Sequence, residues 1–378
     1  MVQKVSVEQK QNSSKRQKLL IVAGATATGK SSLAIELAKK FNGEIISCDS
    51  AQIYQGLDVG TAKLSKEDMQ GVEHHLMSFV PPTEQFSVSE FKMIAEQKIE
   101  EISSRGKLPI LAGGTGLYIE AILNNYNFEN ALVDQEYRNK LQEILKEQNG
   151  KQKLYQMLCQ KNIEKAKKID MNNTRRVIRA LEIEFMHQKA EEQNEQNQIA
   201  GKDKSLDKSG LINLKIKREP LIFNKGMLSY DVKVRNVNTN EYSKEKLKNK
   251  DKLVFKKQPS KYDSFFCVIV EDRQTLYNRI NARVQKMQSE GLYNEVCSLL
   301  NKGVNFTHQS MSAIGYKEWQ PLFQGQKSIN DVIEQIKQNS RRYAKRQITW
   351  FKHRKGVREY ALKDKQRLVC DIENWVNS

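Results

Sequence analysis

The segment Gly24–Ser31, with the sequence GATATGKS, constrains the fold of this chain more than any other feature. It fits the pattern G-x-x-x-x-G-K-[ST] and lies between an apolar run, Leu19–Ala23, and a segment of helical periodicity, Lys30–Phe41. A loop of this kind between a strand and a helix turns backbone N–H groups toward phosphate oxygens. The pattern therefore predicts a phosphate or diphosphate site, with Ser31 as a ligand for Mg²⁺, formed by Gly24, Thr26, Ala27, Thr28, Gly29, Lys30 and Ser31.

Other apolar segments extend this strand–loop–helix unit into a sheet. Glu44–Cys48 and Leu108–Ala112 have the length and composition of buried strands. Between them, Ser87 and Glu90 form a capping-box pattern that begins a helix ending near Gly106. Alternating strands and helices are typical of an α/β fold. We predict a P-loop NTPase-like parallel sheet with helices on both faces, plus a helical insertion domain.

Composition divides the chain into segments. Residues 127–187 are helical and charged, whereas Gln188–Gly210 is nearly free of large apolar residues and is expected to be disordered or loosely ordered. Order returns at Phe265–Val270, a predicted strand, followed by Asp272 as a helix N-cap. We predict a disordered leader (1–18), the first part of the core (19–123), a helical insertion (124–187), a polar low-complexity insert (188–261), the second part of the core with a basic C-terminal helix (262–352) and a tail (353–378).

The chain is strongly basic, with a net charge of +18 and a pI near 9.5. Such a surface attracts polyanions, although solvated lysine-rich faces give the same total. The segment NSRRYAKRQITWFKHRK interleaves cations with aromatic residues, of which we expect Tyr343 and Trp350 to pack in the core. The alternative is an amphipathic helix whose basic face is only solvated. We predict contact with an RNA backbone for Arg341, Arg342, Lys345 and Arg346.

Five widely separated cysteines, never spaced as C-x-x-C, predict a reducing compartment with neither disulfides nor a zinc site. No apolar run approaches the ~20 residues of a membrane span. We therefore predict a cytoplasmic monomer without membrane association, and the basic start of the chain keeps a mitochondrial location as an alternative. The adjacent His74 and His75 are interpreted as a structural pair rather than a metal site.

Asp49 directly follows the second predicted strand, and Thr115 follows the third. In an open parallel sheet, ligands lie outside the carboxyl ends of the strands, so Asp49 is expected to face the same crevice as the phosphate loop. There its carboxylate acts as a general base or binds Mg²⁺ through water. The alternative is an ordinary turn or cap aspartate. We favour the functional interpretation because of the neighbouring loop.

Several longer strings resemble the tRNA dimethylallyltransferase family. They are DSAQIYQGLDVGTAK (from Asp49), LPILAGGTGLYIEAIL (from Leu108), IDMNNTRRVIRALEIE (from Ile169), RINARVQKMQSEGLYNEV (from Arg279), AIGYKE (from Ala313) and RRYAKRQITWF (from Arg341). They occur in the family's order and span roughly Leu19 to Lys352. The phosphate loop is generic, whereas the combination of DSAQ-x-Y, GGTGLY and YAKRQ-x-TW is specific. Departures from the family pattern at Met171 and Ser340 are mild, and Lys352 replaces a usual arginine.

The resemblance implies a reaction. In that family the loop holds the diphosphate of dimethylallyl diphosphate, with Mg²⁺ beside the residue matching Ser31. The residue matching Asp49 takes a proton from the exocyclic N6 of an adenine beside the tRNA anticodon, at position 37, and the residue matching Thr115 helps to orient the reacting groups. The adenine is pulled out of its stack to react. The positions that hold the anticodon arm match Asp49, Ser50, Ala51, Gln52, Arg138, Arg175, Arg176 and Arg179.

Three alternatives stay open. An enzyme that prenylates free adenine nucleotides to cytokinin-type products shares the chemistry, but it needs neither the helical insertion nor the basic C-terminal segment. A nucleotide kinase explains the phosphate loop and leaves DSAQ and YAKRQ without a role. A catalytically inactive RNA-binding protein is expected to have lost Lys30, Asp49 or Thr115, and all three are present.

Overall fold

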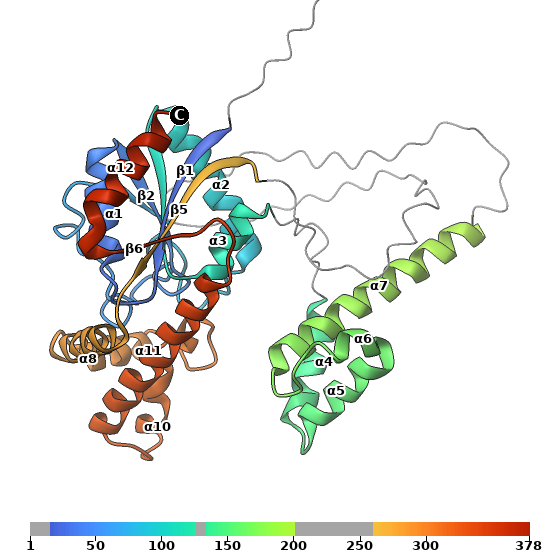
Figure 1. Cartoon of the computed structure of the whole chain (residues 1–378). Coiled ribbons are helices and arrows are strands. Elements are labelled where there is room, and N and C mark those ends of the chain that lie inside the picture. The colour runs from blue at the N-terminus through green and yellow to red at the C-terminus, as the bar shows by residue number, and fades with distance from the viewer. Residues whose placement is uncertain (1–15, 126–133, 201–259) are drawn as a thin grey trace, which may run out of the picture. The chain divides into compact units, whose positions relative to one another are not determined.

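The structure, a computed structural model, describes residues 16–125, 134–200 and 260–378. The chain divides into two compact units, residues 1–126 with 257–378 and residues 127–256. We call their described parts the core unit (16–125 and 260–378) and the helical unit (134–200) (Figure 1). The predicted leader up to residue 15 and the predicted polar insert over 201–259 lie outside the described residues.

The core unit is built on a six-stranded sheet in which every strand pairs in parallel with its neighbours. The strand order is β3-β2-β4-β1-β5-β6. The strands are β1 (Gln17–Gly24), β2 (Gly43–Cys48), β3 (His74–His75), β4 (Leu108–Gly113), β5 (Tyr262–Val270) and β6 (Arg358–Ala361). The four strands predicted from apolar runs are confirmed as β1, β2, β4 and β5.

Helices connect these strands. Those of the core unit are α1 (Lys30–Lys40), α2 (Val88–Ser104), α3 (Gly116–Leu123), α8 (Arg273–Ser289), α9 (Leu292–Asn301), α10 (Gln320–Phe323), α11 (Ile329–Lys352) and α12 (Lys365–Val376). The capping box that begins α2 is confirmed, because Ser87 and Glu90 each bond the other's backbone N–H. The Asp272 side chain caps α8 through the N–H of Thr275, at 2.9 Å.

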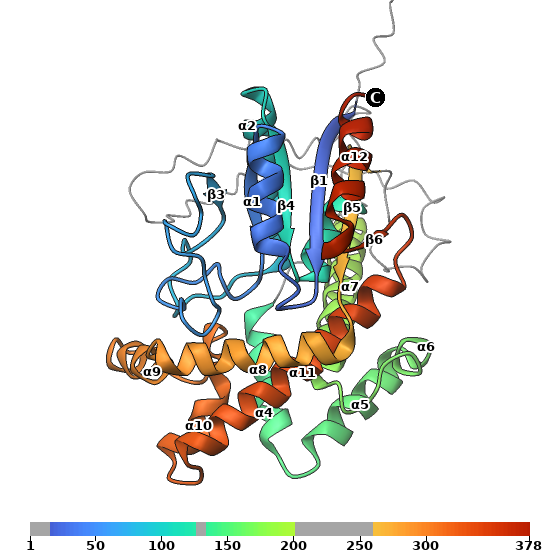
Figure 2. The same cartoon turned by 60° about the vertical axis from the view of Figure 1, so that its left-hand side comes forward.

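Both faces of the sheet are buried, as a parallel sheet requires. Alternate residues of β1 point to opposite faces, so Leu19 and Ile21 belong to one apolar cluster and Leu20 and Val22 to the other. The first cluster includes residues of α2, α3, α8, α9 and α11, and the second includes residues of α1 and α12. Figure 1 shows α1 and α12 on one side of the sheet and α2 and α3 on the other, and Figure 2 shows the same layers after a turn. The predicted fold class is therefore confirmed.

The predicted tail, residues 353–378, is part of the core, which corrects the sequence-based boundary. Its strand β6 pairs with β5, and Leu368 and Ile372 of α12 are buried against the sheet. Strand β6 is short and largely exposed, and α12 carries few apolar residues, so neither produced a clear periodic signal. The edge strand β3 was not predicted for the same reason, because it contains only the two histidines.

The helical unit has its own apolar cluster, formed by α4 (Gln135–Lys146), α5 (Gly150–Lys161), α6 (Ile163–Ala166) and α7 (Thr174–Ala200). Leu141, Leu154 and Leu181 are fully buried there. Helix α7 continues to Ala200, which corrects the expectation that order ends at Gln188. Gln, Glu and Ala are good helix formers, so a polar composition without apolar periodicity does not by itself prevent a helix.

No helix within residues 16–125, 134–200 and 260–378 has both the length and the apolar character that crossing a bilayer requires.

Candidate active site

Three strands end at the same level of the sheet and carry the predicted site residues. Ala23 of β1 and Cys48 of β2 both pair with Gly113 of β4, so the segments that follow these strands leave the sheet side by side. Thr115 then accepts a hydrogen bond from the N–H of Ser50, with a distance of 3.1 Å to its Oγ1. The predicted residues Asp49 and Thr115 therefore lie together, next to the loop that follows β1.

The phosphate loop has a geometry that its glycines permit. Gly24 approaches β5 so closely that a Cβ there would lie 2.8 Å from the Ile269 carbonyl oxygen. Gly29 has a φ of 84°, in the left-handed region that glycine adopts without strain. The N–H groups of Gly29 and Lys30 have no acceptor within the described part of the chain. Unpaired N–H groups at a helix N-terminus are suited to binding an anion.

Lys30 lies at the start of α1 with its ammonium group partly unpaired. Its Nζ donates to the carbonyl oxygen of Ala25 at 3.2 Å. Burial and the nearby Arg283 guanidinium lower the pKa of Lys30 to about 8, and Asp49 partly opposes this shift. Two cations held close together in a buried place favour a bound anion, because the anion removes their mutual repulsion.

Arg283 is a site residue that sequence reasoning missed. It extends from α8, donates through Nη1 to the Thr26 hydroxyl at 2.9 Å and donates through Nη2 to the Thr61 carbonyl oxygen at 2.7 Å. Burial lowers its pKa, and Asp49 acts in the opposite direction. The motif around Arg279–Val296 indicated that this helix mattered, but nothing in its spacing singled out Arg283 from the neighbouring cations.

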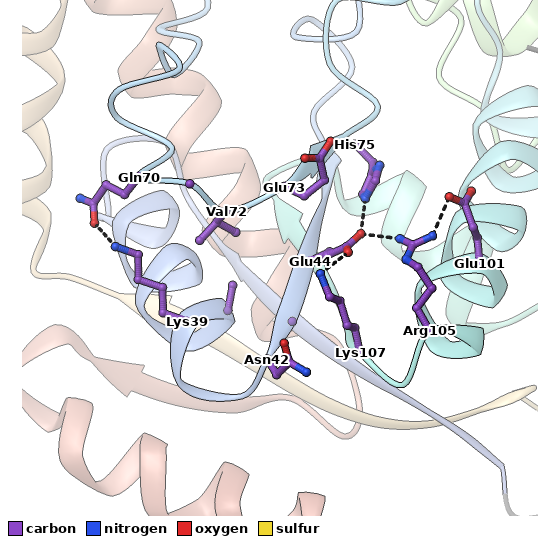
Figure 3. Close-up of a pocket in the computed structure, with 13 residues that line it drawn as sticks. Lys39, Asn42, Glu44, Gln70, Val72, Glu73, His75, Glu101, Arg105 and Lys107 are labelled. Carbon is purple, nitrogen blue, oxygen red and sulfur yellow. Dashed lines mark hydrogen bonds and ion pairs between the residues drawn. The ribbon is translucent and has the colours of Figure 1, made fainter.

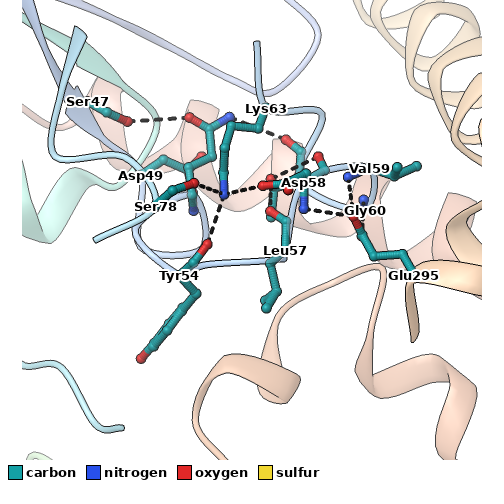
Figure 4. A network of polar contacts seen from close by, with 12 residues as sticks. Ser47, Asp49, Tyr54, Leu57, Asp58, Val59, Gly60, Lys63, Ser78 and Glu295 are labelled. Atoms are coloured by element: carbon teal, nitrogen blue, oxygen red, sulfur yellow. Dashed lines mark hydrogen bonds and ion pairs between the residues drawn. The ribbon is translucent and has the colours of Figure 1, made fainter. Parts of the chain in front are cut away.

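The loop between β2 and β3 is fixed by two charged side chains (Figure 4). Lys63 donates to the Tyr54 carbonyl, the Asp58 carboxylate and the Ser78 hydroxyl at 2.6–2.8 Å. On the other side of the loop, Glu295 of α9 accepts the N–H groups of residues 58, 59 and 60 at 2.7–3.0 Å. These bonds hold the loop that presents the Thr61 carbonyl to Arg283.

Asp49 has one committed carboxylate oxygen and one without a partner. Its Oδ1 accepts the N–H of Ala51 at 2.9 Å and the N–H of Gln52 at 3.4 Å, a turn that fixes the carboxylate. Its Oδ2 has no hydrogen-bond partner within the described residues. The turn interpretation is therefore confirmed, and the catalytic interpretation of Asp49 stays a prediction.

The aromatic ring of Tyr343, on α11, lies against this group. Burial, and then the Asp49 carboxylate, raise the pKa of Tyr343 to about 12, and a hydrogen bond with the Thr115 side chain acts in the opposite direction. The sequence predicted core packing for Tyr343, and its side chain is half-buried. The Tyr343 side chain therefore lies next to Asp49 and Thr115 as well as packing in the core.

The predicted RNA-binding cations of α11 differ in exposure. Arg341 is half-buried and donates to Asn281 at 2.6 Å, whereas Arg342, Lys345 and Arg346 are exposed. Just beyond the end of the helix, the Arg354 guanidinium lies 4.1 Å from the centre of the Trp350 ring. A hollow of about 530 Å³ on this helix is lined by Lys345, Arg346, Thr349, Trp350, His353 and Arg354.

The same helix inserts a buried amide between two loops of the site, which sequence reasoning also missed. Gln347 accepts the N–H of Thr26 and donates to the carbonyl oxygen of Gly114, both at 2.9 Å. Gln347 belongs to the string YAKRQ, yet the sequence gives no indication of which residues it bonds, because they precede it by 321 and 233 positions.

The predicted RNA-binding arginines of the helical unit differ in whether they are paired with a buried carboxylate or exposed. Arg138 and Arg179 both pair with the buried Glu182, which is 1% exposed. Arg175 and Arg176, at the start of α7, are exposed. Gln52 of the core unit also has partners, since it donates to the Thr61 carbonyl and accepts from the Ser47 hydroxyl, both at 3.3 Å.

A hollow of about 600 Å³ lies at the opposite edge of the sheet, where β2 and β4 begin (Figure 3). Its floor is Glu44, whose carboxylate bonds His75, Arg105 and Lys107 at 2.6–2.8 Å. His74 instead bonds the Val72 carbonyl at 2.8 Å. The two histidines therefore have separate local partners, which fits the structural role predicted for them.

The residues beside the phosphate loop fit a hydrated magnesium ion. Mg²⁺ takes few protein ligands and completes its shell with water and substrate phosphate oxygens. The exposed Ser31 hydroxyl in the first turn of α1 is an oxygen of the kind that such an ion can bind. Within the described residues, no group of three or more His, Cys, Asp or Glu side chains forms a protein cage for a metal.

Comparisons with known proteins place this chain in a family. The model of the family described as IPP transferase matches residues 52–222 and 231–354. The match includes most of residues 188–261. The family model therefore covers most of the stretch that composition set apart as an insert. A tRNA dimethylallyltransferase of Staphylococcus epidermidis is 40% identical over 341 residues, which are 90% of this chain and 85% of the relative.

Two further proteins agree with this match. A tRNA dimethylallyltransferase of Geobacillus thermodenitrificans is 38% identical over 357 residues, 94% of each chain. The crystal structure of a full-length tRNA isopentenylpyrophosphate transferase from Bacillus halodurans superimposes with a TM-score of 0.61 at 33% identity, covering 96% of this chain and 97% of that one. The chain therefore belongs to the IPP transferase family, and the curated relatives named here are tRNA dimethylallyltransferases.

Proposed function

We propose that this enzyme transfers a dimethylallyl group from dimethylallyl diphosphate to N6 of the adenine at position 37, beside the anticodon of a tRNA. The observation that carries the proposal is the convergence of a carboxylate, a threonine hydroxyl and a cation-rich phosphate loop at adjacent strand ends. The phosphate loop with its cations suits a diphosphate, and the carboxylate with the threonine hydroxyl suits a nucleophile that must lose a proton. Family membership supports the same activity.

The donor occupies the phosphate loop in this proposal. The N–H groups of Gly29 and Lys30, the Lys30 ammonium and the Arg283 guanidinium bind the diphosphate oxygens. As the bond between C1 and the diphosphate oxygen breaks, negative charge grows on these oxygens, and fixed donors stabilise it. Mg²⁺ held near Ser31 would supply additional positive charge to the leaving group.

Asp49 acts on the acceptor. The N6 nitrogen forms a bond to C1 of the prenyl group, and its proton passes to Asp49, while diphosphate leaves with the electron pair of the broken bond. The turn through Oδ1 keeps the carboxylate in one orientation and leaves Oδ2 for the proton. Thr115 and Tyr343 lie beside the carboxylate and position the reacting groups.

Basic surfaces hold the tRNA in this proposal. A nucleobase must leave its stack to reach Asp49, and the anticodon loop presents unpaired bases. Exposed cations on α11 suit the phosphate backbone, and the hollow beside Trp350 and Arg354 suits a stacked base. Arg175 and Arg176 of the helical unit suit the anticodon arm. A monomeric state and a cytoplasmic location stay predictions.

The experiment compares wild type with Asp49→Asn, using labelled dimethylallyl diphosphate, Mg²⁺ and either total tRNA or AMP. Asparagine keeps the Oδ1 acceptor of the turn and removes the base, so we expect label in tRNA to fall by about 10²–10⁴-fold without a change in melting temperature. Asp49→Ala, which also removes the turn acceptor, serves as the comparison for stability.

The two substrates separate the alternatives. Label that enters AMP but not tRNA would assign the enzyme to the cytokinin-forming class, which the names of the relatives do not favour. ATP-dependent phosphoryl transfer without prenylation would support the nucleotide kinase interpretation instead. Equal activity of wild type and Asp49→Asn would remove the general-base assignment while keeping the reaction.

A further inference from the structure

Gln347 is the one residue of α11 whose side-chain amide bonds both loops of the site. Its side chain is 6% exposed, on a helix whose neighbouring residues Lys345 and Arg346 are exposed. Its Oε1 accepts from the Thr26 N–H and its Nε2 donates to the Gly114 carbonyl oxygen, both at 2.9 Å. The acceptor and the donor of the amide are therefore both used.

These two partners lie just beyond the last rung of the sheet. The pairing of β1 with β4 ends at Ala23 and Gly113. Thr26 and Gly114 follow these two residues in the sequence and are not paired between β1 and β4. Gln347 bonds the N–H of one segment and the carbonyl oxygen of the other, so it connects the two segments beyond the last β1–β4 pair.

Each of these partners belongs to one half of the reaction site. Thr26 is in the phosphate loop, and its hydroxyl also receives the Arg283 guanidinium. Gly114 precedes Thr115, whose hydroxyl receives the Ser50 N–H beside Asp49. The fit on the second side is tight, because a Cβ at Gly114 would lie 2.2 Å from the Gln347 amide nitrogen.

We infer that Gln347 is a positioning residue that sets the spacing between the diphosphate-binding loop and the Asp49–Thr115 side of the site. The inference rests on the proposed function. Displacement of the phosphate loop relative to Asp49 moves C1 of the donor away from N6 of the acceptor, and small misplacements of reacting atoms lower rates strongly. Gln347 itself contacts neither substrate.

Removal of the amide predicts a specific kinetic pattern. Gln347→Met has a similar length but leaves the Thr26 N–H and the Gly114 carbonyl unpaired, a change that shifts both loops. We expect kcat to fall about tenfold or more and KM for dimethylallyl diphosphate to rise about tenfold, each of which corresponds to ~1.4 kcal/mol. KM for tRNA should change less than about twofold, because the cations of α11 that we propose to hold the tRNA backbone are exposed, whereas Gln347 is buried and bonds the two loops.

The measurement combines steady-state kinetics with direct binding of inorganic diphosphate by calorimetry, in the presence of Mg²⁺. Gln347→Met should bind diphosphate about tenfold more weakly than wild type. A matched control is Gln338→Met, on an exposed position of the same helix, which should behave as wild type. Melting temperatures accompany each variant.

A second variant disturbs the same bridge from its other end. In Gly114→Ala the added methyl group displaces the Gln347 amide, so the kinetic pattern should repeat. Because both changes break one connection, the double variant should be little worse than either single variant, a non-additive result. Independent, additive effects would show that the two residues do not act through a shared contact.

The outcomes separate the inference from the proposed function. If wild type prenylates tRNA and Gln347→Met lowers only the melting temperature or the active fraction, with KM and diphosphate affinity unchanged, Gln347 is merely structural and the inference is wrong. If wild type transfers no prenyl group to tRNA, the proposed function fails instead. Diphosphate binding then still tests whether Gln347 positions the phosphate loop.

Discussion

The two edges of the central sheet hold charged clusters that are built in opposite ways. At the edge where β2 and β4 begin, the buried Glu44 is surrounded by His75, Arg105 and Lys107 (Figure 3). At the edge where the strands end, Lys30 and Arg283 lie close together, and one Asp49 carboxylate oxygen has no hydrogen-bond partner in the described part of the chain. In the first cluster each charge is paired with an opposite charge, whereas the second holds two cations close together in a buried place.

The pKa shifts show the same contrast. Hydrogen bonds from Lys107, His75 and Arg105 outweigh the desolvation of Glu44 and lower its pKa to about 2. For Lys30, burial and the neighbouring Arg283 lower the pKa to about 8, so the protein destabilises the positive charge of the Lys30 side chain. We interpret the cluster that stabilises its charges as structural and the one that destabilises them as a binding site for an anion. Each of the following predictions tests that distinction.

In the comparison of the two clusters, the largest expected effect is the loss of activity in Lys30→Met. Removal of a cation that stabilises the leaving diphosphate should lower kcat/KM by roughly 10²–10³-fold, without lowering the melting temperature, because a strained buried charge is removed as well. The matched variant at the other edge is Lys107→Met, which should keep its kcat/KM and lose stability. Equal losses of activity in the two variants would contradict the functional difference between the edges.

The second effect is a loss of stability in Glu44→Gln. The amide cannot satisfy the three donors that the carboxylate accepts, so the free energy of unfolding should fall by about 2 kcal/mol. Urea unfolding followed by circular dichroism measures the change, and prenyl transfer should persist. Glu101→Gln, which removes an exposed partner of Arg105, should cost less than about 0.5 kcal/mol.

The stability that Glu44 contributes should depend on pH. Its folded-state pKa lies below the ordinary value of 4.5, so the contribution is complete above pH 4.5 and is lost as pH falls toward about 2. The difference in unfolding free energy between wild type and Glu44→Gln should therefore shrink as pH falls from 5 to about 3. A difference that stays constant over this range would show that ionisation of Glu44 is not its source.

The smallest effect is proton uptake when diphosphate binds. With a pKa of about 8, the Lys30 side chain is about half protonated in the free enzyme at pH 8. A bound anion raises this pKa, so binding should take up about half a proton. Calorimetry in two buffers of different ionisation enthalpy measures this uptake. Lys30→Arg, which stays charged, corrects for protonation of the ligand itself. Identical uptake in both proteins would mean that Lys30 is already fully charged before binding.

Local features of the site were predictable because short segments determine them. The phosphate loop follows from its glycines between a strand and a helix, and Asp49 follows from its place directly after a buried strand. The capping box of α2 was equally local. The errors were local too: β6 and α12 lack a strong period, and the polar end of α7 resembles a disordered segment in composition.

The sequence alone determined the fold class, the phosphate loop, the position of Asp49 and the family resemblance, since each depends on residues close together in the chain. Only the tertiary structure decided which distant side chains complete the site. Arg283 and Gln347 reach Thr26 from 257 and 321 positions away, and Glu44 gathers its partners from β3 and the region around β4. Such contacts depend on how helices pack on the sheet, and no pattern of neighbouring residues specifies that packing.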